Sequence, residues 1–231
     1  MSATTRRRLD AATGTAFVAL IVVALALPGQ PPKADDSIET VTTLLVDHRR
    51  AFLISGYVGG LAAMAYLWFL GSVRSYLGAG SADEASGAAS AGGIFAIALL
   101  LLGMTMLSGV AFVVARSGHP ALVRAFTDSG NSAIEASKFG FGLFLLAVSR
   151  AGATSGLLPR WLTRLGFAFV PLILVSAASL FVERGPFQFG GVIDVAGGLP
   201  ALLWIAALSV VMVPSVSAET ARHERAASRP S

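Results

Sequence analysis

Apolar residues recur along the chain in six long runs that are separated by short polar segments. The runs cover residues 11–27, 51–70, 92–115, 133–149, 161–182 and 192–213. Each is close to the roughly 20 residues with which a helix crosses a bilayer. Lipid offers no hydrogen bonds to a bare backbone, so each run is expected to be a spanning helix. The pattern predicts an all-α integral membrane bundle with six transmembrane helices.

A shorter amphipathic segment lies in the polar loop before the second run. Its apolar residues fall on one helical face: Ile38, Val41, Leu44 and Leu45. Asp36 and Glu39 have the spacing of a capping box. We therefore expect a short interfacial helix before the second span. The charged cluster 47–50 that ends it fits either a headgroup or anion site or, more simply, a solvated anchor at the membrane surface.

Composition supports the membrane class. Hydrophobic residues make up 55% of the chain and charged residues 13%, against about 25% charged in soluble domains. The formal net charge of +4 reflects basic residues at span ends, which act as topology signals rather than as a nucleic-acid surface. The absence of cysteine excludes disulfides, thiol nucleophiles and thiolate metal sites.

The distribution of basic residues predicts the orientation. With the N-terminus inside, ten of the 17 Lys and Arg residues fall in inner segments, six fall in outer segments, and Lys138 lies within a span. This bias favours the cytoplasmic membrane with both termini cytoplasmic. The expected divisions are a cytoplasmic segment 1–10, a transmembrane domain 11–213 and a disordered cytoplasmic tail 214–231. A cleavable signal peptide is an alternative interpretation of the basic N-terminus and first apolar run.

The fourth run differs from the others because it carries opposite charges. A polar stripe recurs there at helical spacing, formed by Asn131, Glu135, Lys138, Gly142 and Ser149, and such a stripe faces the bundle rather than lipid. Asp194 lies near the start of the sixth run. The resulting hypothesis is an outward-facing polar pocket. Lys138 is its cation, and Glu135 or Asp194 is the counter-ion and a candidate proton carrier.

A purely structural interpretation of the same residues is also open. Ser132 and Glu135 fit a capping box at a helix start, and Lys138 would then extend its ammonium to the headgroups. Glu135 and Lys138 would pair locally at (i, i+3) spacing. Asp194 would complement the dipole at the start of its helix.

Other chemistry has little basis in the sequence. The three histidines are scattered, and the HExxH, GxSxG, P-loop and GxGxxG motifs are absent. We therefore expect no catalytic residues, no metal ligands and no cofactor, and an enzyme is the least favoured class.

Two short motifs carry a resemblance. The sequence HR at 48–49 leads into a span that ends in WFLG at 68–71, and GLLPRWL at 156–162 opens the fifth span. In these motifs the chain resembles a group of uncharacterised actinobacterial multi-pass membrane proteins. The resemblance implies a small helical membrane protein of unknown function, and it carries over no catalytic residue.

Two function classes follow. The first is a small-solute or lipid binding or transport protein that uses the polar pocket at Glu135, Lys138 and Asp194. The alternative is a structural or interaction subunit of a membrane complex. Its partner would be another membrane protein or a second copy, packed on the small-residue stripe of the second span, Ser55, Gly59 and Ala63. In both cases the bilayer surrounds the chain, and no nucleic acid is expected.

Overall fold

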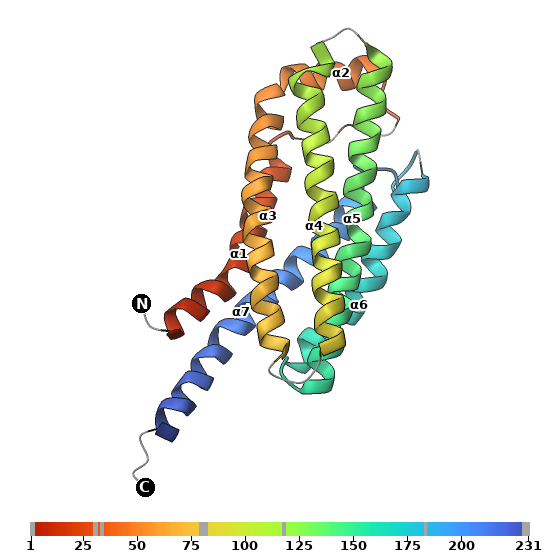
Figure 1. Ribbon diagram of the computed structural model, residues 1–231. Helices are drawn as coiled ribbons and strands as arrows, with labels where there is room; N and C mark the ends of the chain where they lie inside the picture. Colours follow the sequence, from red (N-terminus) through yellow and green to blue (C-terminus); the bar gives the residue numbers. More distant parts are fainter. Residues whose placement is uncertain are drawn as a thin grey trace.

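The computed structural model describes residues 3–29, 32, 35–78, 83–116, 119–182 and 184–227, and these contain helices and no strand (Figure 1). The helices are α1 (Ala3–Ala26), α2 (Ile38–Asp47), α3 (Arg49–Gly78), α4 (Asp83–Phe112), η1 (Val114–Arg116), α5 (Pro120–Ser155), α6 (Arg160–Ser176), η2 (Ala177–Phe181) and α7 (Val192–Ala227). The predicted all-α class is confirmed.

Five of these helices are long and apolar enough to cross a membrane: Arg49–Gly78, Glu84–Phe112, Pro120–Ser155, Arg160–Phe181 and Val192–Val213. The apolar part of α1, Ala12–Ala26, is shorter. It presents Phe17, Ile21 and Ala24 to the core while Val22 and Val23 stay exposed. Large apolar side chains are also exposed on the other helices. Such a surface is unfavourable in water and suits contact with lipid.

The helices form one bundle. In Figure 1, α3, α4 and α5 run side by side, and α2 lies across one end of them. α1 packs against both α3 and α7, and α6 packs against α5 and α7. The start of α1 and the end of α7 lie away from α2. We call the end that carries α2 the α2 end.

The interfacial helix folds over that end. Val41 and Leu45 of α2 are fully buried and pack with Phe52 and Val123, while Ile38 and Leu44 are partly buried beside them. The predicted apolar face is therefore confirmed, but the predicted capping box is wrong. The N-cap is Ser37, whose hydroxyl accepts a hydrogen bond from the backbone N–H of Thr40 at 3.2 Å.

α5 is one continuous helix that begins 13 residues before the predicted span 133–149, so Gly130 does not break it. Pro120 occupies its first turn, as expected for a residue without a backbone N–H donor. Gly130 is a packing point instead: a Cβ there would lie 3.2 Å from the carbonyl oxygen of Gly103 on α4. Further along, a Cβ on Gly140 would meet the backbone nitrogen of Ala96 at 2.5 Å. The glycines thus allow α4 and α5 to approach backbone to backbone.

Tyr66 lies near the end of the second apolar run, but its side chain is fully buried at the centre of the core. Its ring packs against Phe17 at 4.6 Å between centroids and edge-on against Phe141 and Phe144. Trp68, two residues further along α3, is largely exposed. The two residues lie two positions apart on a helix, so they point in different directions.

α7 continues past the apolar run to Ala227, into a segment for which the sequence predicts disorder. The segment contains alanine and glutamate, which are strong helix formers. The last residues of the predicted tail, 228–231, lie outside the described residues, as does the first part of the N-terminal segment.

Candidate functional site

The polar stripe of the fourth apolar run faces the interior of the bundle. Asn131, Glu135, Lys138, Gly142 and Ser149 are all buried on α5, which confirms the orientation predicted from their spacing. Ser132 lies in the middle of α5, twelve residues after its first residue Pro120. The alternative in which Ser132 caps a helix start is therefore wrong.

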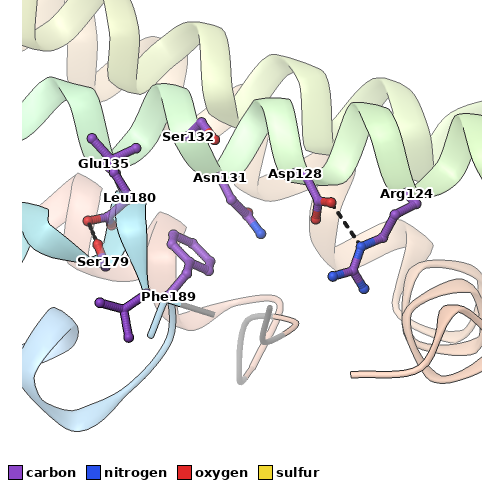
Figure 2. A pocket seen from close by; sticks show the side chains of 9 residues that line it. Arg124, Asp128, Asn131, Ser132, Glu135, Ser179, Leu180 and Phe189 are labelled. Atoms are coloured by element: carbon purple, nitrogen blue, oxygen red, sulfur yellow. Dashed lines mark hydrogen bonds and ion pairs between the residues drawn. The ribbon is translucent and has the colours of Figure 1, made fainter. Parts of the chain in front are cut away.

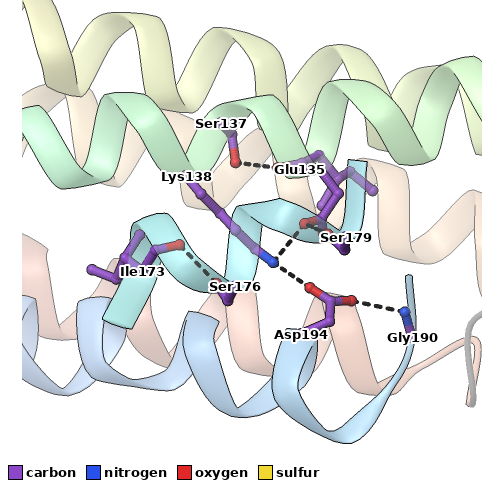
Figure 3. A network of polar contacts seen from close by, with 9 residues as sticks. Glu135, Ser137, Lys138, Ile173, Ser176, Ser179, Gly190 and Asp194 are labelled. Atoms are coloured by element: carbon purple, nitrogen blue, oxygen red, sulfur yellow. Dashed lines mark hydrogen bonds and ion pairs between the residues drawn. The ribbon is translucent and has the colours of Figure 1, made fainter. Parts of the chain in front are cut away.

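Lys138 bridges two carboxylates from different helices. Its Nζ lies 2.7 Å from Glu135 Oε2, one turn earlier on α5, and also donates a hydrogen bond to Asp194 Oδ1 on α7 (Figure 3). Lys138 is 8% exposed, Glu135 2% and Asp194 6%. The ammonium therefore points into the bundle rather than to the membrane surface. The structure brings together all three residues that the sequence singled out, and their role in binding stays a prediction.

Asp194 is held by the loop that precedes its helix. It lies in the first turn of α7, where the helix dipole favours a negative charge. Its Oδ2 accepts a hydrogen bond of 2.7 Å from the backbone N–H of Gly190, while Oδ1 faces Lys138. Asp194 therefore has the predicted position at the helix start, where Oδ2 accepts from the backbone, and it also forms the predicted ion pair through Oδ1.

Glu135 has a second donor that the sequence did not single out. The hydroxyl of Ser179 donates a hydrogen bond to Glu135 Oε2, the same oxygen that contacts Lys138. Ser179 belongs to η2, the short 3₁₀ turn into which α6 tightens before the chain leaves the bundle. A serine in an apolar run carries no distinguishing signal. Only the position of η2 beside α5 places this hydroxyl at the site.

The cluster contains two carboxylates and one ammonium. Buried charges are costly in lipid unless they are paired and hydrogen-bonded. Here the carboxylates of Glu135 and Asp194 accept hydrogen bonds from the ammonium of Lys138, the hydroxyl of Ser179 and the N–H of Gly190. The arrangement ties α5, η2 and α7 together at one point.

A pocket of about 340 Å³ lies next to the cluster, towards the α2 end of α5 (Figure 2). It is lined by Arg124, Asp128, Asn131, Ser132, Glu135, Ser179, Leu180, Val182 and Phe189. Glu135 and Ser179 belong both to the lining and to the ion-paired cluster. The carboxylate of Glu135 therefore connects the pocket to Lys138 and, through it, to Asp194.

Arg124 and Asp128 form an ion pair at the pocket, and Arg124 also contacts a loop. Arg124 Nε lies 2.8 Å from Asp128 Oδ2, and another nitrogen of the guanidinium donates to the carbonyl oxygen of Asp36 at 2.9 Å. Arg124 therefore links α5 to the segment that leads into α2. Arg124 lies before the predicted fourth span 133–149, and it reaches this pocket because α5 extends back to Pro120.

Asn131 is the least satisfied polar group in the pocket. The residue is 7% exposed, and Oδ1 has no hydrogen-bond partner among the described residues. Figure 2 shows the amide projecting from α5 on the side that carries Glu135 and Arg124. Buried polar groups nearly always have a partner, so Asn131 is an exception that a hydrogen bond from a water or another polar molecule would remove.

The charged cluster at 47–50 lines a separate surface hollow of about 530 Å³ at the junction of α2 and α3. The Arg49 guanidinium lies 4.9 Å from the centroid of the Phe112 ring, a cation–π contact. His48 and Arg50 are exposed. These positions fit the anchor interpretation, and they are distant in sequence from the cluster at Lys138.

The described residues contain no group of three or more His, Asp or Glu side chains arranged to hold a metal ion. The motif GLLPRWL is a turn between helices. Gly156 ends α5 with φ 69°, Pro159 caps α6, and Trp161 is half exposed at its start. This geometry accounts for the motif without a ligand. Comparisons with protein-family models, with curated proteins and with solved structures found no match to the chain.

Proposed function

We propose that this membrane protein binds a small polar solute in the pocket beside Glu135. The observation that carries the proposal is the combination of a hollow with buried polar groups. The pocket of about 340 Å³ is lined by Glu135, which is ion-paired to Lys138 inside the bundle, and by Asn131, whose Oδ1 has no hydrogen-bond partner among the described residues. Burying such groups costs free energy, and a binding role explains why they stand at a pocket.

The interaction-subunit alternative has less support. It requires a free small-residue face on α3, but Ser55, Gly59 and Ala63 are buried. The hydroxyl of Ser55 donates to the carbonyl oxygen of Ala24 on α1 at 2.7 Å, and a Cβ on Gly59 would overlap the side chain of Met104 on α4. This stripe is used to pack α3 against its own neighbours.

The proposal includes an orientation. Both termini are cytoplasmic, the protein lies in the cytoplasmic membrane, and the α2 end with its pocket faces outward. The excess of basic residues in segments that would be inside supports this orientation. The solute would then enter from outside the cell, and Lys138 would lie at the inner end of the site.

The test is a solute screen against a variant in which the pocket is filled. Ser132 is exposed at the lining, so Ser132→Trp would fill the pocket without disturbing the cluster. Ser129 is exposed on the same helix outside the lining, and Ser129→Trp is the matched control. Purified protein is heated with small cations, anions and neutral polar solutes.

At least one solute should raise the melting temperature of the wild type and of Ser129→Trp, but not that of Ser132→Trp. If no solute stabilises the wild type, or if the stabilisation persists in Ser132→Trp, solute binding in this pocket is wrong.

A further inference from the structure

We propose that the solute is a small protonated amine, a class of ligand that the pocket recognises by charge. This inference rests on the proposed function and adds the chemistry of the ligand. It is carried by the charge balance around Glu135, by the buried amide of Asn131 and by an aromatic ring at the same pocket.

The charged residues around the pocket favour a cationic ligand. Among the described residues, the pocket and the cluster behind it hold three carboxylates, Asp128, Glu135 and Asp194, against the two cations Arg124 and Lys138. The guanidinium of Arg124 is engaged by Asp128 and by the carbonyl oxygen of Asp36. An anionic solute would meet this excess negative charge, whereas a cation would reduce it.

Glu135 is positioned to accept a hydrogen bond from such a cation. Both of the contacts described for its carboxylate, from Lys138 and from Ser179, go to Oε2. A carboxylate has two oxygens that each accept, so Oε1 keeps its capacity. An N–H group of a ligand in the pocket would supply a charge-assisted hydrogen bond to it.

Two further residues favour an amine over an inorganic cation. Asn131 lines the pocket, and its amide, whose oxygen has no partner among the described residues, has the capacity to accept a hydrogen bond from a polar ligand or to donate one to it. Phe189 lines the same pocket from the loop before α7 (Figure 2), and the face of an aromatic ring attracts an ammonium group. Leu180 and Val182 add apolar lining that suits a short alkyl group.

The experiment compares four probes of similar size on the purified full chain: ethylammonium, tetramethylammonium, acetate and acetamide. Binding is followed by the shift in melting temperature and by calorimetric titration. Ethylammonium should bind most tightly, since it has both the charge and N–H donors. Tetramethylammonium, which has the charge alone, should bind at least tenfold more weakly, because charge-assisted hydrogen bonds are lost.

Two variants at one position give opposite expectations. Asn131→Leu removes the buried amide and should weaken ethylammonium binding about tenfold. Asn131→Asp adds a carboxylate to the lining and should strengthen it several-fold. Ser129→Asp places the same charge on α5 outside the pocket lining, and it should leave ethylammonium affinity within about twofold of the wild type, since exposed charges are screened.

The outcomes separate the two proposals. Preferential binding of acetate or acetamide, or weaker ethylammonium binding in Asn131→Asp, overturns the amine class and leaves solute binding intact. If none of the four probes binds, the amine class is overturned too. The proposed function itself then fails only if the wider solute screen is also empty.

Discussion

At the scale of single residues, Lys138 holds the site together. Its ammonium pairs with Glu135 on its own helix and with Asp194 on α7, and all three side chains are at least nine-tenths buried. Removing one partner from a buried ion pair leaves an uncompensated charge, which costs far more than the loss of an exposed pair.

The substitution Lys138→Met tests this role. It keeps an unbranched side chain that is one atom shorter and removes the charge, so two carboxylates would face each other without a cation. We expect the free energy of unfolding to fall by about 3–5 kcal/mol, measured by surfactant titration of the purified protein. Arg150→Met removes an exposed cation from the same helix and should change it by less than about 1 kcal/mol. Equal stability of the two variants would show that Lys138 is not paired inside the bundle.

The sequence was sufficient to find the charged residues of the site but not its other members. Glu135, Lys138 and Asp194 stand out because charges are rare in apolar runs. Ser179 and Phe189 reach the site only through the η2 turn and the loop before α7. No periodicity marks such residues, since their place depends on tertiary structure.

At the scale of helices, close packing of α6 and α7 positions Asp194 opposite Lys138. Gly197 follows Asp194 by about one turn of α7, and a Cβ at Gly197 would overlap the side chain of Ser176 at the end of α6. A Cβ at the next residue, Gly198, would meet no described atom within 4 Å. Gly197 therefore faces α6, whereas Gly198 faces open space.

This asymmetry gives a matched pair of substitutions. Gly197→Ala should push α7 away from α6 and destabilise the protein by about 1–3 kcal/mol, the usual cost of overpacking. Gly198→Ala should be neutral or stabilising by up to about 1 kcal/mol, since alanine is the better helix former. Melting temperatures of the two variants measure the difference. If Gly198→Ala is the more damaging, the packing of α7 on α6 described above is wrong.

The hydrophobic pattern predicted the positions of the helices well, but it did not predict where several of them begin or end. The six predicted runs all lie within helices or their 3₁₀ extensions, apart from a residue or two at some ends. The largest difference is at the start of α5: the apolar run begins at residue 133, but the helix begins at Pro120 and continues through Gly130. In a helix whose packing partner needs a close approach, glycine is a contact point instead of a break.

At the scale of the whole molecule, the orientation of the helices in the membrane determines on which side the pocket opens. The lack of cysteine allows single cysteines to be introduced at the two ends of one helix. Ala121 and Ala153 are both exposed, near the start and the end of α5. If the α2 end faces outward, a membrane-impermeant maleimide should label Ala121→Cys in intact cells and label Ala153→Cys only after lysis. The reverse pattern would invert the proposed orientation.

The central claim is that Lys138 of α5 and Asp194 of α7 form an ion pair inside the bundle. A double-mutant cycle of Lys138→Met, Asp194→Asn and the two together tests it most directly, with the free energy of unfolding as the measurement. We expect a coupling free energy of about 1–3 kcal/mol, with the double variant less destabilised than the sum of the single variants. Additivity within about 0.5 kcal/mol would mean that the two side chains do not interact, and the site described here would not exist.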